Sequence, residues 1–182
     1  MSIDKSLVLS KSPDPNKIIL KSFDNSKNTA LMSVTQVAKT TSEGVVPVEI
    51  VTIELLPDEA PNHVSEIKKL INGGYYNGII FHRVMDLGDG YIAQTGDLIS
   101  VGFKIEGTIK AEFSSLPFDR GTVAMARASD PDSATTQFFF TMDSIPRLNG
   151  EYTIFGKVTD GMSFIDLIER GSPSATPDKI VS

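Results

Sequence analysis

The feature that most constrains the fold is a series of short strand-like runs that fills most of the chain after residue 30. In the run Val45–Leu56, the residues Val51, Ile53 and Leu55 alternate with polar residues, the period of two typical of a half-buried strand. The run Ala30–Ala38 precedes it across a polar tip, so the two predict a β-hairpin. Five further runs follow: Gly78–Met85, Tyr91–Thr95, Gly121–Ala126, Gln137–Met142 and Tyr152–Val158.

Two segments have helical spacing instead. Val64, Ile67 and Leu70 recur at intervals of three after a Pro-rich acidic stretch, and a Gly-Gly pair at 73–74 would end that helix. A second amphipathic segment runs from Met162 to Ile168. Many short strands with only two helices, far apart in the sequence, favour an antiparallel β-barrel or sandwich capped by helices.

The length indicates one domain. The 182 residues include 40% apolar and 22% charged residues, which is ordinary for a globular protein. Residues 1–29 mix Ser, Pro, Asn and Lys without a sustained period, so we expect a partly ordered N-terminal extension before a domain at residues 30–182. No apolar run approaches the ~18 residues of a membrane-spanning helix, so no membrane span is expected.

Composition excludes several chemistries. With no cysteine and only two histidines, His63 and His82, the chain cannot build a disulfide scaffold, a thiol nucleophile or a histidine-rich metal site. The net charge of −6 gives no support to nucleic-acid binding. We therefore expect neither a metal nor a cofactor.

Four motifs follow one another between residues 81 and 156. They are F-H-R-V at 81–84, Q-T-G-D at 94–97, M-A-R at 125–127 with Q-F-F at 137–139, and L-N-G at 148–150 with F-G at 155–156. Together they resemble the cyclophilins, the peptidyl-prolyl cis/trans isomerases, over residues 30–171, and the M-A-R-A-S-D form is similar to bacterial members. The resemblance implies an eight-stranded antiparallel β-barrel capped by two α-helices, acting on proline-containing peptides and unfolded chains.

Isomerisation of an X-Pro bond suits a site with few reactive side chains. The partial double bond gives a barrier of ~18–20 kcal/mol, so uncatalysed exchange takes tens to hundreds of seconds. In the twisted transition state the prolyl nitrogen loses conjugation and becomes more basic. Catalysis then needs an apolar slot for the ring, an anchor for the neighbouring carbonyl and a donor aimed at the nitrogen.

The resemblance assigns these roles to particular residues. Arg83 matches the catalytic arginine, whose planar guanidinium can donate to the carbonyl and the nitrogen. Gln94 would hold Arg83 or the substrate carbonyl. The predicted substrate-binding residues are Tyr91, Ile92, Phe139 and Leu148 in the proline slot, Ala126 as a backbone anchor, and Tyr152 at the pocket edge.

Strand alternation separates neighbours of these residues from the site. Three consecutive aromatic residues, Phe138, Phe139 and Phe140, should point to alternate faces, so we assign the first and third to the core and Phe139 to the slot. His82 beside Arg83 should face the other way. We interpret it as a buried structural histidine rather than a general base.

Several residues depart from the family pattern. Arg147 stands where cyclosporin-sensitive members have Trp, so we expect weak binding of cyclosporin A. Tyr152 replaces their His, as in many bacterial sequences. The segment between Arg83 and Tyr91 is longer than is common in the family, which alters the rim of the pocket.

The primary hypothesis is a monomeric prolyl isomerase. Two alternatives remain: a proline-motif binding scaffold with little turnover, and a chaperone-like binder that uses residues 1–29. The joint presence of Arg83, Gln94 and Phe139 favours the enzyme, because binding a proline ring alone does not require the arginine. The lack of cysteine suits a bacterial periplasmic protein without its leader and a cytoplasmic protein alike.

Overall fold

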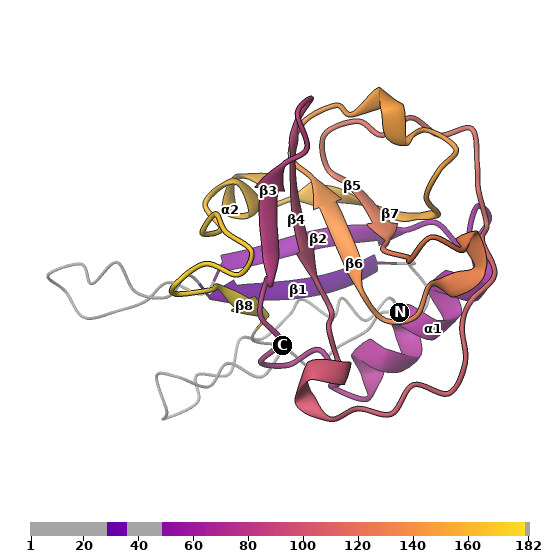
Figure 1. The fold of residues 1–182 in the computed structure, drawn as a ribbon, viewed down its shortest axis with the longest axis horizontal. Coiled ribbons are helices and arrows are strands. Elements are labelled where there is room, and N and C mark those ends of the chain that lie inside the picture. Colours follow the sequence, from indigo (N-terminus) through magenta and orange to yellow (C-terminus); the bar gives the residue numbers. More distant parts are fainter. Residues whose placement is uncertain (1–28, 36–48, 181–182) are drawn as a thin grey trace, which may run out of the picture.

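The computed structural model describes residues 29–35 and 49–180, which form a mainly β fold with two α-helices (Figure 1). The strands are β1 (Thr29–Thr35), β2 (Glu49–Leu55), β3 (Arg83–Asp86), β4 (Tyr91–Thr95), β5 (Thr122–Met125), β6 (Phe138–Thr141), β7 (Ile154–Asp160) and β8 (Lys179–Ile180). The helices are α1 (Pro61–Asn72) and α2 (Met162–Asp166), with 3-10 turns η1 (Ile99–Val101), η2 (Pro131–Ser133) and η3 (Pro146–Leu148). The expected extension at 1–28 and the hairpin tip at 41–44 lie outside the described residues.

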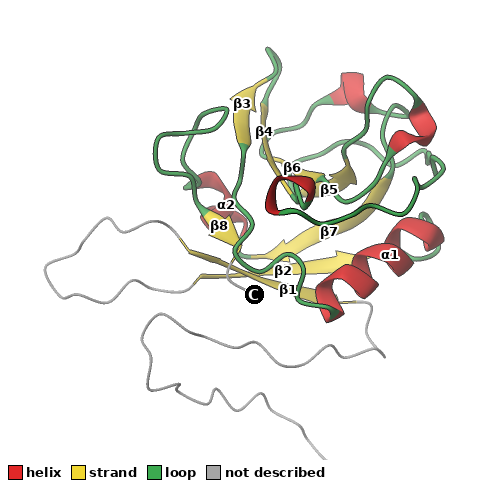
Figure 2. Ribbon diagram, turned by 60° about the horizontal axis from the view of Figure 1, so that its bottom comes forward, coloured by secondary structure: helices red, strands yellow, loops and turns green. Residues whose placement is uncertain are grey.

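All the strands belong to one sheet in the order β3-β4-β6-β5-β7-β2-β1-β8, and every pairing is antiparallel. Figure 2 shows the sheet strongly curved, with α1 and α2 at different sides of it. The mainly β, antiparallel fold with two helices is therefore confirmed. No described helix is long and apolar enough to cross a bilayer.

The predicted closed barrel needs correction. Within the described ranges, β3 and β8 are the two ends of the sheet and no ladder joins them. The chain just before β3 meets β8 at a bridge between Ile80 and Lys179, flanked by hydrogen bonds from the backbone N–H groups of Gly78 and Phe81 to the carbonyls of Ile180 and Asp178. Since β8 is two residues long and β3 begins three residues after this bridge, the pairing is too short to form a continuous ladder.

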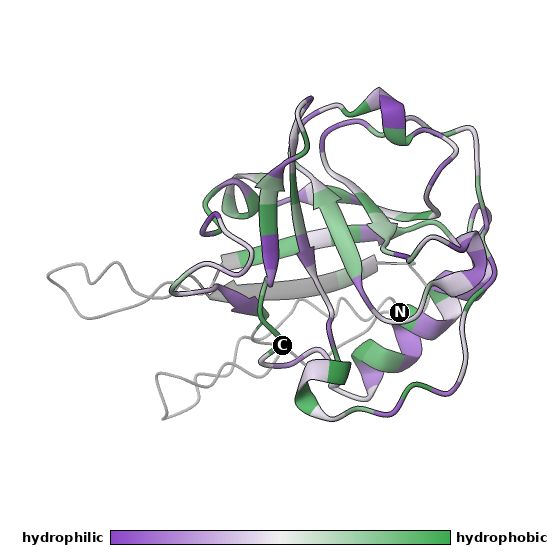
Figure 3. Cartoon of the chain, viewed as in Figure 1, coloured by the Kyte–Doolittle hydropathy of each residue, from purple (hydrophilic) through white to green (hydrophobic). Residues whose placement is uncertain are grey.

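The apolar faces of strands and helix α1 meet in the main core. This core takes alternate residues of β2 (Val51, Ile53 and Leu55), Phe138 and Phe140 of β6, and the buried face of α1. Phe139 belongs to a second apolar cluster on the opposite face of the sheet. Figure 3 shows β6 apolar along its length, whereas α1 carries both polar and apolar residues. The predicted alternation is thus confirmed: Phe138 and Phe140 face the main core and Phe139 faces the other side.

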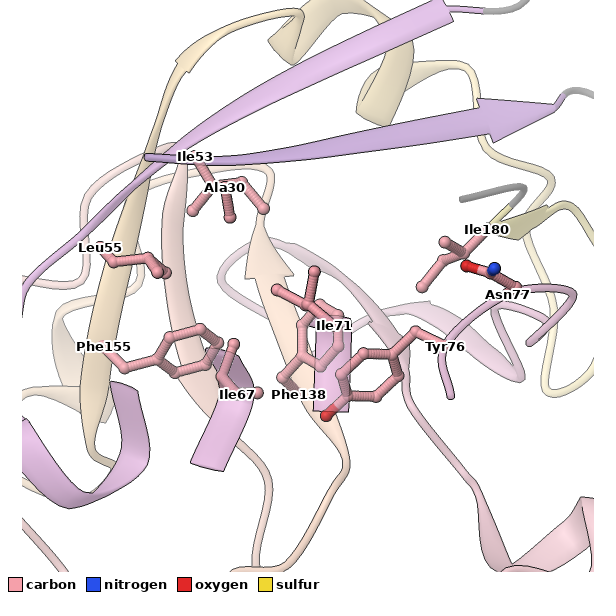
Figure 4. Close-up of a pocket in the computed structure, with 10 residues that line it drawn as sticks. All are labelled: Ala30, Ile53, Leu55, Ile67, Ile71, Tyr76, Asn77, Phe138, Phe155 and Ile180. Carbon is pink, nitrogen blue, oxygen red and sulfur yellow. The ribbon is translucent and has the colours of Figure 1, made fainter. Parts of the chain in front are cut away.

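A small cavity remains inside the main core. Its volume is about 50 Å³, and it lies between α1 and the sheet, lined by apolar side chains that include Ile67, Phe138 and Phe155 (Figure 4). Waters that occupy protein cavities normally find several polar partners, which these walls hardly supply. This cavity is therefore a packing gap of the apolar core rather than a ligand site.

Helix α1 is capped from a distance. Ala60, at its N-cap, has no side chain that could accept a hydrogen bond, so the first backbone N–H groups need another partner. The carboxylate of Glu112 accepts from the backbone N–H groups of Asn62 and His63, both at 3.0 Å, and from Nδ1 of His63 at 2.6 Å. A negative charge at this end of a helix is favourable.

His63 is fully buried, and its Nε2 has no partner. A proton on Nε2 would bury an N–H without an acceptor, so burial lowers the pKa of His63 despite the attraction of Glu112. Burial of Glu112 opposes its charged form, but the hydrogen bonds from His63 and Asn62 outweigh this and lower its pKa. The pair is therefore neutral imidazole donating to a carboxylate.

Acid should weaken the fold through this pair. The unfolded chain binds a proton at His63 near pH 6.5 and the folded chain binds it less readily, so stability falls as the pH drops below about 6.5. The contribution of Glu112 is lost at lower pH, below about 4.5. We expect the thermal midpoint to decrease from pH 7.5 to 5.5, and His63→Asn, which keeps a side-chain N–H donor without titrating, to show a smaller decrease.

The measurement is the thermal midpoint of the wild type and of His63→Asn, determined by calorimetry at several pH values between 7.5 and 5.5. Burial also lowers the pKa of His82, so the variant should keep part of the dependence. Glu106→Gln, at an exposed position, is the control and should follow the wild type. Identical slopes for wild type and His63→Asn would contradict the assignment.

Candidate active site

Three of the predicted site residues form a row across neighbouring strands. Arg83 of β3 pairs with Gln94 of β4, and Gln94 pairs in turn with Phe139 of β6. Residues directly opposite one another in antiparallel strands project from the same face of the sheet. The register therefore brings together side chains that are far apart in the sequence, on the face opposite the main core.

The guanidinium of Arg83 is held by a short polar network. Its Nη1 donates to Oε1 of Gln94 at 3.2 Å, and its Nε lies 3.1 Å from the sulfur of Met85. Nε2 of Gln94 then donates to Oε1 of Gln137 at 2.9 Å. Because Gln94 is buried, its amide holds the guanidinium of Arg83 in one direction. The permanently charged Arg83 therefore loses little further side-chain entropy when it binds a ligand.

These residues border a cleft of about 220 Å³. All but one of the predicted site residues line it. The lining consists of Arg83, Leu87, Ile92, Gln94, Ala126, Arg127, Phe139, Arg147, Leu148 and Tyr152. The cleft is apolar at its floor and polar at its edges, which is the usual character of a small-ligand site.

The floor of the cleft is built from aromatic and aliphatic residues packed as a second core. Phe139 is only 3% exposed; its ring stacks near Phe118, with centroids 6.2 Å apart, and meets the ring of Tyr152 edge-on at 5.4 Å. Ile92 and Leu148 belong to the same cluster. Because these rings pack against each other, the slot keeps its shape without a ligand.

Tyr91 is not among the residues that line this cleft. Successive residues of β4 point to opposite faces, so Ile92 faces the cleft and Tyr91 faces the other side. There the Tyr91 ring packs against the main core, with the guanidinium carbon of Arg170 4.6 Å from its centroid.

Four residues were not assigned to the site from the sequence: three line the cleft, and the fourth, Gln137, supports it from outside the lining. Gln137 completes the network of Arg83, and Leu87 comes from the β3–β4 turn. Arg127 donates from Nε to the carbonyl of Glu151 at 3.0 Å, and its guanidinium carbon lies 4.7 Å from the Tyr152 ring centroid. Gln137 and Arg127 lie within the Q-F-F and M-A-R motifs, which were the available signal.

The third of these lining residues, Arg147, was considered only for drug binding. Its Nε donates to Oδ1 of Asp89 at 2.9 Å and its Nη2 donates to the carbonyl of Leu87 at 3.0 Å. No sequence signal linked it to a turn some 60 residues earlier. His82, in contrast, is not among the lining residues, and burial lowers its pKa, in line with a neutral structural role.

The cleft is cationic in an acidic protein. Three arginines line it, Arg83, Arg127 and Arg147, although the whole chain carries a net charge of −6. Asp89 pairs with Arg147 and Glu151 lies 3.5 Å from Arg127. Arg83 instead has a neutral amide as its partner, which leaves its charge available to a carbonyl or an electron-rich nitrogen.

A match to a family of known proteins extends over most of the chain. Residues 39–182 match the model of the cyclophilin type peptidyl-prolyl cis-trans isomerases. The chain belongs to the cyclophilin family. A probable peptidyl-prolyl cis-trans isomerase of Brucella suis is 45% identical, with 72% of this chain and 74% of that protein covered. Peptidyl-prolyl cis-trans isomerase B of Bacillus subtilis is 38% identical over 66% of this chain and 84% of its own.

Solved structures agree with this cyclophilin assignment. Cyclophilin AquaCyp293 from Hirschia baltica has a TM-score of 0.70 at 25% identity, over 94% of this chain and 74% of its own. A cyclophilin type isomerase of Cryptosporidium parvum, solved in the presence of the dipeptide Ala-Pro, has a TM-score of 0.66 at 29% identity over 84% of this chain and 95% of its own. The expected family and its peptidyl-prolyl isomerase activity are thus confirmed.

Proposed function

We propose that this cyclophilin isomerises X-Pro bonds at the cleft between β3, β4 and η3, with Arg83 as the donor. The observation that carries the proposal is the position of the Arg83 guanidinium, held by Gln94 at the edge of an apolar floor. The reaction needs this combination, because the electron-rich nitrogen is itself a member of the proline ring, so a donor must lie at the edge of the surface that holds the ring.

Each part of the site has a role in this proposal. The ring of the proline would lie on Ile92, Phe139 and Leu148, which exclude water from the amide. Arg83 donates to the carbonyl or, as the bond twists, to the prolyl nitrogen. Since that nitrogen accepts a hydrogen bond only when it is pyramidal, this contact favours the transition state over both planar ground states.

The remaining residues place the chain on either side of the proline. Ala126 offers backbone groups at the cleft, and Tyr152, half-buried between Arg127 and Phe139, presents a hydroxyl at its edge. Substrates would be proline-containing peptides and unfolded chains. The Cryptosporidium neighbour, solved in the presence of Ala-Pro, supports proline-containing peptides as the ligands.

We also infer that a single copy of the domain, beginning near β1, is sufficient for isomerisation. Every residue of the cleft lies between Arg83 and Tyr152 of a single chain, which supports a monomer.

The test is a protease-coupled assay of isomerisation on a short peptide that contains Ala-Pro. The wild type should accelerate cis-to-trans conversion in proportion to enzyme concentration. A folded protein that binds the peptide but leaves the rate unchanged would reduce the proposal to that of a proline-binding scaffold.

Cyclosporin A should inhibit this enzyme weakly. Arg147 is 49% exposed and already engaged by Asp89, so the drug would have to displace a hydrated cation rather than meet a rigid indole. Losing such an aromatic contact commonly costs ~2 kcal/mol, or ~30-fold in affinity. We expect Arg147→Trp to be inhibited at least ~30-fold more strongly than the wild type in a titration. Arg147→Lys, the control, should stay insensitive, and nanomolar inhibition of the wild type would contradict the argument.

A further inference from the structure

We propose that the β3–β4 turn, residues 86–90, is a specificity element in which Leu87 receives an apolar side chain next to the substrate proline, and that Arg147 is the positioning residue for this turn. The inference rests on the proposed function and extends it from the proline to its neighbour. It assigns substrate preference to a turn within the segment between Arg83 and Tyr91, which the resemblance to the family indicated to be longer than is common.

The turn is closed by its own hydrogen bonds. Oδ1 of Asp86 accepts from the backbone N–H of Gly88 at 2.8 Å, and the N–H of Leu87 donates to the carbonyl of Gly90 at 2.9 Å. Gly88 has φ +102°, which a residue with a side chain rarely adopts. These features fix the path of the turn from the end of β3 to the start of β4.

The turn is also anchored to the segment around η3. Arg147 bonds it at two points, the carboxylate of Asp89 and the carbonyl of Leu87. Behind it, Oδ2 of Asp143 accepts from the N–H of Tyr91 at 2.8 Å. Gly90 packs so closely there that a Cβ on it would lie 2.8 Å from Cβ of Asp143. The turn therefore keeps one position relative to Leu148, which follows Arg147 in η3.

Leu87 is the side chain that this anchoring brings to the cleft. It is half-buried, packs against the cluster of Phe139 and Leu148, and lines the cleft with them. Charged residues of the turn, Asp86 and Asp89, are exposed. Leu87 thus extends the apolar floor up to the rim, next to the place where the proline ring would lie.

The chemistry of this wall defines the preferred neighbour. An apolar side chain beside the proline would gain contact with Leu87, whereas a carboxylate would have to compete with Asp89 for Arg147 and would lose hydration against the leucine. Small residues would leave Leu87 exposed to water. We therefore expect bulky aliphatic residues to be preferred over alanine and over glutamate.

The experiment measures kcat/KM by NMR exchange spectroscopy on two peptide series, one varied before the proline and one after it, with Ala, Leu or Glu at the varied position. In one of the two series the wild type should prefer Leu over Ala roughly three- to tenfold, through KM, below the range for a fully enclosed pocket. Leu87→Ala should reduce this ratio to about one, since the wall for the extra methylenes is gone.

Arg147→Ala tests the positioning role with Leu87 in place. It should lower the Leu/Ala ratio by about half or more, and it should have no further effect on the ratio in a Leu87→Ala background, because both changes remove the same wall. Asp89→Asn should act in the same direction. Lys69→Ala, which removes an exposed ion pair with Glu66 on α1, is the matched control and should leave the ratio unchanged.

The outcomes separate this inference from the proposed function. A wild type that isomerises none of the peptides would overturn the proposed function itself. Equal rates on the Ala, Leu and Glu peptides, a preference for Glu, or a Leu preference that survives Leu87→Ala would overturn the inference alone. Circular dichroism melts of each variant check that the ratios refer to folded protein.

Discussion

Arg83→Ala is expected to lower kcat/KM for X-Pro isomerisation by ~10²–10³, the scale found when one preorganised donor to a transition-state charge is removed. The variant loses the guanidinium that Gln94 holds at the cleft, and no other side chain in the described part of the chain takes that place in the row across β3, β4 and β6. Folding should change little, because Arg83 is only half-buried and contributes to neither apolar core.

Two further variants sharpen this test. Arg83→Lys keeps the charge but not the planar fork, so most of the activity should still be lost. Lys157→Ala, at an exposed position of β7, is the control and should keep full activity. A folded Arg83→Ala enzyme with more than half the wild-type kcat/KM would show that the donor has been assigned wrongly.

Phe139→Ala should impair both stability and activity, because the floor of the cleft is also the centre of the second apolar cluster. Its ring is 3% exposed and contacts Phe118 and Tyr152, so truncation should cost ~3–5 kcal/mol. For a chain of this length each kcal/mol moves the midpoint by ~2–4 °C, which gives a decrease of roughly 6–20 °C. Activity measured well below the new midpoint should fall as well, since the slot loses a wall.

The matched control is Phe113→Ala, which removes the same ring from a position that is 44% exposed. It should change neither the midpoint nor the rate appreciably. Phe139→Leu would retain much of the apolar volume and should recover more stability than activity, because the flat edge that meets the proline ring is missing. Unchanged turnover in folded Phe139→Ala would remove this residue from the site.

Local patterns predicted most of the elements and most of the site. The alternation in β2 and β6 assigned Val51, Ile53, Phe138 and Phe140 to the core, because a strand turns successive side chains to opposite faces whatever its neighbours are. The same rule, applied to β4, would have separated Tyr91 from Ile92. The resemblance to the family instead placed both in one slot, whereas Tyr91 packs against the main core and Ile92 belongs to the second cluster.

Contacts over a long sequence separation were beyond such reasoning. Glu112 caps the N-terminus of α1 although it follows that end of the helix by about 50 residues in the sequence. Gln137 likewise completes the hydrogen-bond network of Arg83 from a distant segment of the chain. Neither has a periodic signal, because a single polar side chain on a loop or a strand gives no indication of its partner. The absence of a ladder between β3 and β8 in the described part of the chain could not be predicted either, because it depends on how these two distant strands lie relative to each other.

The sequence by itself determined seven of the described strands, the two helices and the chemistry, because side-chain period and the order of short motifs are local properties of the chain; the two-residue β8 is too short to show a period. Only the tertiary structure decided which residues meet. The register of β3, β4 and β6 set Arg83, Gln94 and Phe139 in one row, and the approach of η3 to the β3–β4 turn joined Arg147 to Asp89. These contacts depend on strand order and on the packing of distant segments, which no local pattern encodes.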